Sequence, residues 1–219
     1  MVHNRLLLSL LVLFFFCSNG IAQRKWSQYS FGETCTFFIP ETFELRNQDC
    51  AFGQFVNERV KEIDKKLGED YTNRKIVFQP IGLNEGLIDA SSTYARIVVS
   101  TCTVSPSINQ MTIKQLTPKA ISAVEQDIKN VKMQTFHEMA PSGAKIIWQS
   151  FKRTLIGGKY ALVSSYRQSS PQGGFTAVKE YKFFFGSHYL FIMTMYRESE
   201  NEKWANDIAT FIRTLQFLK

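Results

Sequence analysis

The apolar residues of this chain recur with two periods, the three-to-four-residue period of helices and the two-residue period of strands. The helical period predicts helices at residues 49–67, at residues 117–140 and near residues 200–215. Thr117 suits the N-cap of the second helix, because Pro118 then takes the first helical position, where its missing N–H is no loss. The apolar stripes of the second and third helices are Ile121, Val124, Ile128 and Val131, and Trp204, Ile208, Phe211 and Leu215.

The other apolar segments are short and rich in β-branched or aromatic residues, as strands are. Strands are expected at residues 34–39, 75–79, 93–103, 144–154, 159–168, 176–185 and 188–197. Gly157-Gly158 and Gly186-Ser187 separate consecutive strands and predict hairpins, with Gly186 at a positive φ. The arms around Gly186-Ser187 are apolar on both faces but only of strand length. This pattern favours central strands of a sheet that is covered on both sides, and excludes a membrane span.

Residues 1–22 have the features of a cleaved secretory signal: a short basic start, an apolar segment at residues 6–16, and small residues before the cleavage point. The apolar segment is about half of the ~20 residues that a spanning helix needs. Lipid attachment at Cys17 is disfavoured, because bulky phenylalanines precede it where lipoprotein signals have small residues. We therefore expect cleavage after Ala22, export to the periplasm or the exterior, and a single domain at residues 23–219.

The net charge of the chain is positive. It has 26 Lys and Arg residues against 19 Asp and Glu residues, a net charge of +7, and loss of Arg5 with the signal lowers it to +6. This excess favours acidic surfaces or anionic ligands in general terms. The basic residues are dispersed, however, which indicates a surface of mixed charge and no nucleic-acid partner. Glu198, Glu200 and Glu202 cluster before the last helix, where they interact favourably with its dipole.

Three cysteines follow the predicted cleavage point: Cys35, Cys50 and Cys102. An exported chain meets oxidising conditions, in which three cysteines can form one disulfide and leave one thiol. If the strand of Cys35 pairs antiparallel with the strand that ends at Cys102, these two residues come within bridging distance and Cys50 is the free thiol. A second interpretation stays open, in which all three cysteines are small buried side chains without a bridge.

Several catalytic motifs are present only in part. His137 precedes Glu138, but no second histidine follows four positions after the first, as a zinc-protease motif needs. Ser142 and Lys145 have Ser-x-x-Lys spacing in a predicted loop, whereas the chemistry requires a helix that points the lysine back at the serine. Gly-x-Ser-x-Gly is absent, and His188 adjoins a tight turn, which indicates a structural role. The sequence therefore predicts no catalytic residues, no metal site and no cofactor.

Three stretches of the chain resemble the Mog1/PsbP-like family. The first is Tyr29-Ser-Phe-Gly with Phe37-Phe-Ile-Pro-Glu-Thr-Phe43, similar to the family's opening strand, which ends in a proline and an aromatic residue. The second, Leu155-Ile-Gly-Gly-Lys-Tyr-Ala161, is similar to its turn into a strand. The third, Phe211-Ile-Arg-Thr-Leu-Gln-Phe217, is similar to its closing pattern, with Leu215 in place of a serine. The resemblance spans nearly all of residues 23–219 and implies an α+β fold, an α/β/α sandwich with a central, mainly antiparallel sheet.

Members of this family are mostly non-catalytic binding or assembly factors, among them photosystem subunits, a partner of a nuclear-transport GTPase and exported bacterial proteins. Their metal-binding and contact residues have no matched motif here, so no site residue is carried over. The resemblance implies an exported, non-catalytic binding or assembly module of the cell envelope, whose partner is an envelope protein or a small ligand. The alternative is a carrier of a small apolar ligand or lipid, or an enzyme without a visible motif. A large apolar cavity beneath a helix layer favours the carrier.

Overall fold

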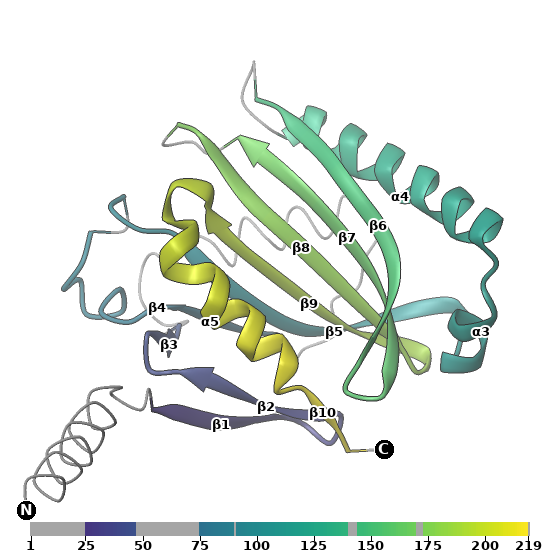
Figure 1. Ribbon diagram of the computed structural model, residues 1–219, viewed down its shortest axis with the longest axis horizontal. Coiled ribbons are helices and arrows are strands. Elements are labelled where there is room, and N and C mark those ends of the chain that lie inside the picture. Colours follow the sequence, from purple (N-terminus) through teal and green to yellow (C-terminus); the bar gives the residue numbers. More distant parts are fainter. Residues whose placement is uncertain (1–24, 47–74, 90, 140–143, 170–172, 219) are drawn as a thin grey trace, which may run out of the picture.

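The computed structural model describes residues 25–46, 75–89, 91–139, 144–169 and 173–218. The predicted signal, the predicted helix at residues 49–67, Cys50 and Ser142 lie outside these residues. The large sheet consists of β3 (Phe43–Leu45), β4 (Lys75–Pro80), β5 (Ala95–Ile108), β6 (Ile146–Ile156), β7 (Lys159–Ser169), β8 (Phe175–Phe184) and β9 (Gly186–Arg197). Its spatial order is β3-β4-β5-β9-β8-β7-β6, and every neighbouring pair is antiparallel (Figure 1). The predicted antiparallel sheet is therefore confirmed.

The strands β6 to β9 pair consecutively and antiparallel, and both predicted glycine turns are where the sequence places them. Gly157 and Gly158 have φ values of +55° and +78°, which L side chains rarely adopt. In the last hairpin Phe184 is the register partner of Tyr189, and the N–H of Phe185 donates to the carbonyl of His188 at 2.8 Å. Gly186 and Ser187 are thus the two turn residues, with φ +81° at the glycine.

A second, three-stranded sheet brings together the two ends of the described chain. It consists of β1 (Trp26–Phe31), β2 (Cys35–Pro40) and β10 (Gln216–Phe217), in the order β1-β2-β10. The hydroxyl of Thr214 also accepts a hydrogen bond from the N–H of Phe38 at 3.0 Å. Only β2 was expected as a strand, because β1 is half polar and β10 is two residues long.

Successive residues of the central strands point into different layers, as the pleat requires. Phe183 belongs to a core with α5 (Asn201–Arg213) and the small sheet, whereas Phe184 belongs to a core with α3 (Gln110–Gln115) and α4 (Pro118–Met139). Figure 1 shows α5 in front of the strands and α4 along the β6 side of the sheet. Helices cover both faces, so the predicted sandwich architecture is confirmed.

The helices start and pack largely as predicted. Thr117 caps α4, because its hydroxyl accepts a hydrogen bond from the N–H of Ala120 at 3.2 Å. The predicted stripe of α5 is buried throughout. The stripe of α4 is wrong at one position, since Val131 is 60% exposed. Lys132 takes the inward position at that turn and reaches Glu180 on the sheet. No helix in the described part of the chain is both long and apolar enough to cross a membrane.

The strand pairing behind the predicted Cys35–Cys102 bridge is wrong. Strand β2 pairs with β1 and β10 in the small sheet, while β5 pairs with β4 and β9 in the large one. Cys35 is buried in the core beneath α5, Cys102 is buried in the core beneath α3 and α4, and the structure does not join them. Because β5 alternates its side chains between two layers, Cys102 points away from the layer that contains Cys35. The interpretation of these two cysteines as small buried side chains fits their positions.

Candidate functional site

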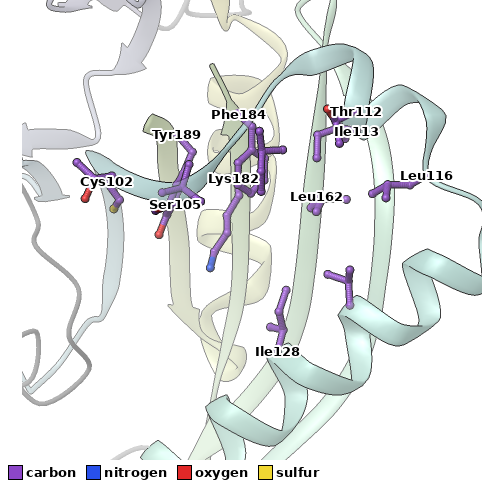
Figure 2. Close-up of a pocket in the computed structure, with 14 residues that line it drawn as sticks. Cys102, Ser105, Thr112, Ile113, Leu116, Ile128, Leu162, Lys182, Phe184 and Tyr189 are labelled. Carbon is purple, nitrogen blue, oxygen red and sulfur yellow. The ribbon is translucent and has the colours of Figure 1, made fainter. Parts of the chain in front are cut away.

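A pocket of about 470 Å³ lies between the large sheet and the helices α3 and α4 (Figure 2). Strands β5, β7, β8 and β9 and both helices supply its wall. Most of the wall is apolar, through Ile113, Leu116, Val124, Ile128, Leu162 and Phe184. The pocket therefore lies between two packed layers, with strand residues of the large sheet on one side and the helices α3 and α4 on the other.

One end of α3 is fixed to the sheet by Gln110. The side-chain amide of Gln110 donates to the carbonyl oxygens of Tyr160 at 3.1 Å and Phe184 at 3.2 Å. Its oxygen accepts from the N–H of Tyr160 at 2.6 Å. Asn109 caps the helix, accepting from the N–H of Thr112 at 2.9 Å. These bonds hold the first turn of α3 against two neighbouring strands.

The other end of α3 is held by Arg153 of β6. Its Nη1 donates to the carbonyl oxygens of Ile113 at 3.1 Å and Leu116 at 3.0 Å, and also to that of Lys114. The last carbonyls of a helix have no partner within the helix and carry partial negative charge, so a guanidinium there is favourable. The same guanidinium lies 5.6 Å from the centre of the Tyr160 ring. Together Gln110 and Arg153 make α3 a fixed wall of the pocket.

Helix α4 is tied to the sheet by an ion pair between a half-buried lysine and a buried carboxylate. Lys132 Nζ lies 2.7 Å from Oε1 of Glu180, and the Tyr166 hydroxyl donates to the same oxygen at 2.7 Å. Burial by itself raises the pKa of Glu180, but the positive charges of Lys132 and Lys182 oppose it. The hydrogen bonds from Lys132 and Tyr166 add to this opposition, and the net result is a pKa below the usual value. Glu180 is therefore an ionised carboxylate at neutral pH.

Trp148 of β6 supplies a second attachment for α4. Its indole N–H donates to Oε1 of Glu125 on the helix at 2.8 Å. Its ring stacks on Tyr166, with centroids 6.0 Å apart and planes within 4° of parallel. Lys132 Nζ lies 5.5 Å from the centre of the same tyrosine ring. Both helices over the pocket are consequently held by directional contacts.

Lys182 is the only charged side chain among the described residues that line the pocket. Its Nζ lies 5.4 Å from the centre of the Tyr189 ring, a cation–π distance. Figure 2 shows the lysine extended from β8, with its nitrogen directed away from Phe184. The other polar lining groups are those of Cys102, Thr103, Ser105, Thr112 and Tyr189. The pocket thus presents one cation within a largely apolar wall.

A second hollow, of about 640 Å³, lies on the opposite face between α5 and the strands. Small side chains such as Ala205 and Ala209 of α5 leave this space open. Charged side chains of both signs line it, among them Lys179, Glu198 and Arg213. It differs from the first pocket in having no single, isolated charge.

The residues that the sequence singled out do not form one site. His137 is exposed on α4, and His188 is exposed at the start of β9, with its ring 6.0 Å from that of Phe185. Cys102 lines the pocket, and Cys35 lies in the core of the other face. Within the described ranges, no group of three or more His, Cys, Asp or Glu side chains is placed to hold a metal ion.

The polar and charged residues that fix the walls of the pocket and supply its charge were missed in the sequence, although the predicted stripe of α4 contained two of its apolar lining residues, Val124 and Ile128. Glu180 and Lys182 occupy the same alternate positions of β8 as the buried Phe184. Two charged residues at alternate positions of a strand can be detected in a sequence. The central strands are apolar on both faces, however, so the sequence did not show which face of β8 points toward which helices. Gln110 and Arg153 had no local signal, because their hydrogen-bond partners are distant in the sequence.

No protein-family model matches this chain, and a search of curated proteins finds no match. Among solved structures, cyanobacterial PsbP (CyanoP) of Synechocystis matches with a TM-score of 0.52 and 9% identity, over 91% of this chain and 96% of that one. LpqN of Mycobacterium tuberculosis, described as involved in cell envelope biogenesis, matches with a TM-score of 0.45 and 10% identity, over 89% and 91%. A Pseudomonas aeruginosa protein of unknown function, described as a putative regulator, matches with a TM-score of 0.41 and 12% identity, over 86% and 94%.

The similarity to cyanobacterial PsbP extends over almost the whole of both chains at very low identity, so it bears on the fold alone. The antiparallel sheet and the helices on its two faces agree with a PsbP-like α+β fold. The chain therefore has a PsbP-like fold.

Proposed function

We propose that the chain is a non-catalytic binding module of the cell envelope that holds a small, largely apolar ligand beneath α3 and α4. The observation that carries this proposal is the pocket of about 470 Å³ with its mainly apolar wall. Pockets that enclose small molecules have volumes of roughly 300–1,000 Å³ and few polar groups. Of the function classes that the sequence left open, a cavity beneath a helix layer supports the small-ligand carrier.

The physical driving force is burial of the ligand's apolar surface, which contributes about 25 cal/mol per Å² removed from water. The fixed positions of α3 and α4 add to this, because a preformed wall costs little ordering when the ligand enters. Gln110 and Arg153 hold α3, and Lys132 and Trp148 hold α4. The proposal therefore needs no large rearrangement of the fold.

The envelope location rests on the signal-like features of residues 1–22. N-terminal sequencing of the protein from its own cells is expected to begin at Gln23. An envelope-anchored product that retains Met1 would contradict export by a cleaved signal.

Binding is tested with phenylnaphthylamine, an uncharged apolar dye whose fluorescence increases in apolar surroundings. Val124→Phe adds ring atoms to the pocket wall, and Val131→Phe adds them to the same helix at a site that is 60% exposed. We expect the unsubstituted protein and Val131→Phe to bind the dye alike. Val124→Phe is expected to bind it at least about tenfold more weakly, because the added side chain competes for the same space.

A second pocket-filling variant, Ile128→Phe, guards against a folding defect in the first, and near-UV circular dichroism checks both. The proposal fails if the unsubstituted protein does not bind the dye. It also fails if both filled variants fold and bind the dye as the unsubstituted protein does.

A further inference from the structure

The charge in the pocket comes from one strand position. Lys182 lies on β8 between Glu180 and Phe184, and all three side chains point to the α4 side of the sheet. Lys182 as a whole is half-buried, and its Nζ lies 5.4 Å from the centre of the Tyr189 ring. A lysine in the middle of a central strand is costly to bury unless an anion or water compensates it.

The nearby carboxylate is already engaged by other groups. Glu180 lies 2.7 Å from Lys132 Nζ and accepts the Tyr166 hydroxyl at the same oxygen. Lys182 lowers the pKa of Glu180 through its charge, yet no ion pair joins the two residues in the described part of the chain. Among the described residues, two lysines thus face one carboxylate, which leaves one positive charge in excess at the pocket.

The pocket wall around Lys182 has a polar part and an apolar part. Thr103 and Ser105 of β5 line the pocket together with Lys182. Much of the remaining pocket wall is apolar and comes from the helical segment and from β7: Ile113, Leu116, Val124, Ile128 and Leu162. A complementary ligand has one anionic group and an apolar body that is several times larger.

We propose that the pocket binds a small amphipathic anion, an apolar body with a carboxylate or phosphate head that pairs with Lys182. This inference rests on the proposed function and specifies the class of ligand. The ammonium donates hydrogen bonds to the anionic oxygens, and such charge-assisted bonds are stronger than neutral ones. The apolar body fills the space beneath α3 and α4, where water has few hydrogen-bond partners.

Decanoate and decanol test the inference, because they share a chain and differ in the charge of the head. The affinity of each is measured by its displacement of phenylnaphthylamine from the protein at pH 7, at concentrations below those at which it aggregates. We expect the unsubstituted protein to bind decanoate about tenfold more tightly than decanol, because only decanoate pairs with Lys182. The preference is not larger, because Lys182 is partly exposed and water and salt partly screen the ion pair. Lys182→Gln is expected to abolish this preference by weakening the binding of decanoate.

Lys179→Gln is the matched control. Lys179 is exposed on the same strand and lines the hollow on the opposite face. It therefore removes the same charge from β8 without touching the pocket. A preference for decanoate that survives Lys182→Gln, or that Lys179→Gln removes equally, overturns the inference.

The outcomes separate this inference from the proposed function. Equal binding of decanoate and decanol by the unsubstituted protein rejects the anion and keeps the apolar pocket. Absence of dye binding rejects the pocket itself. Co-sedimentation with phosphatidylglycerol vesicles identifies the source of the head group: binding that Lys182→Gln abolishes assigns it to a membrane lipid, and binding of decanoate alone assigns it to a free amphiphile.

Discussion

Replacing Glu180 by glutamine removes the charge that holds α4 over the pocket while preserving the shape of the side chain. The side chain of Glu180 is 3% exposed and that of its partner Lys132 is 33% exposed. Removing one partner of a fully buried pair costs about 3–5 kcal/mol, whereas an exposed pair contributes about 0–1 kcal/mol. Because Lys132 can turn toward water when its partner is neutral, we expect Glu180→Gln to lower the free energy of unfolding by about 2 kcal/mol.

The same substitution has a predictable pH dependence. The folded pKa of Glu180 lies below the value of 4.5 expected for the unfolded chain. Its contribution to stability is therefore fully present above about pH 4.5 and is lost as the pH falls through the lower folded value. The difference in stability between the unsubstituted protein and Glu180→Gln should be constant near neutral pH and shrink below pH 4.5.

Urea unfolding followed by tryptophan fluorescence measures both effects, and Glu202→Gln, an exposed position in the first turn of α5, is the control. A double-mutant cycle with Lys132→Met isolates the pair, with an expected coupling of about 1–3 kcal/mol. If Glu180→Gln is as stable as the control at pH 7, or its deficit persists unchanged in acid, the carboxylate does not hold the helix.

Two further predictions concern single residues. Gly186→Val should lower the free energy of unfolding by about 1–3 kcal/mol through backbone strain at φ +81°. A steric clash adds nothing to this cost, because the nearest atom to an added Cβ, Ser107 Oγ, is an ordinary 3.5 Å away. An unchanged melting temperature would show that the turn tolerates a side chain. Burial raises the pKa of the Cys35 thiol to about 12, so a disulfide reagent at pH 8 should leave it unmodified until urea unfolds the protein. Peptide mapping checks this, and rapid labelling of Cys35 in the folded protein would contradict its burial.

Much of the secondary structure could be predicted because it depends on neighbours in the sequence. The Gly186-Ser187 turn follows from the backbone freedom of one glycine between two apolar runs. Thr117 caps α4 because its hydroxyl reaches an N–H only three residues away. The stripe of α5 appears as a repeat of apolar residues, and each of its members is buried. The sandwich follows from strands that are apolar on both faces and so require a cover on each.

The sequence by itself thus determined most of the described helices and strands, though not β1, β3, β10 or the short α3, and that the sheet has two covered faces. These features depend on backbone geometry and local period. Only the tertiary structure decided how the strands outside the predicted hairpins pair. It placed Cys35 and Cys102 in different cores. It also gave Glu200 a role that its position before a helix did not indicate: its carboxylate accepts hydrogen bonds from Thr93, Tyr94 and Trp204.

The pocket is a feature that only the tertiary structure decided. Its volume is the space that remains when two helices settle on a curved sheet at distances set by Gln110, Arg153 and the Lys132–Glu180 pair. Each of these contacts joins residues that are far apart in the chain, and no repeat of apolar and polar positions encodes a gap between layers. The sequence contained the charge of Lys182, but only the assembled layers made it the one charged side chain among the described residues of a largely apolar wall.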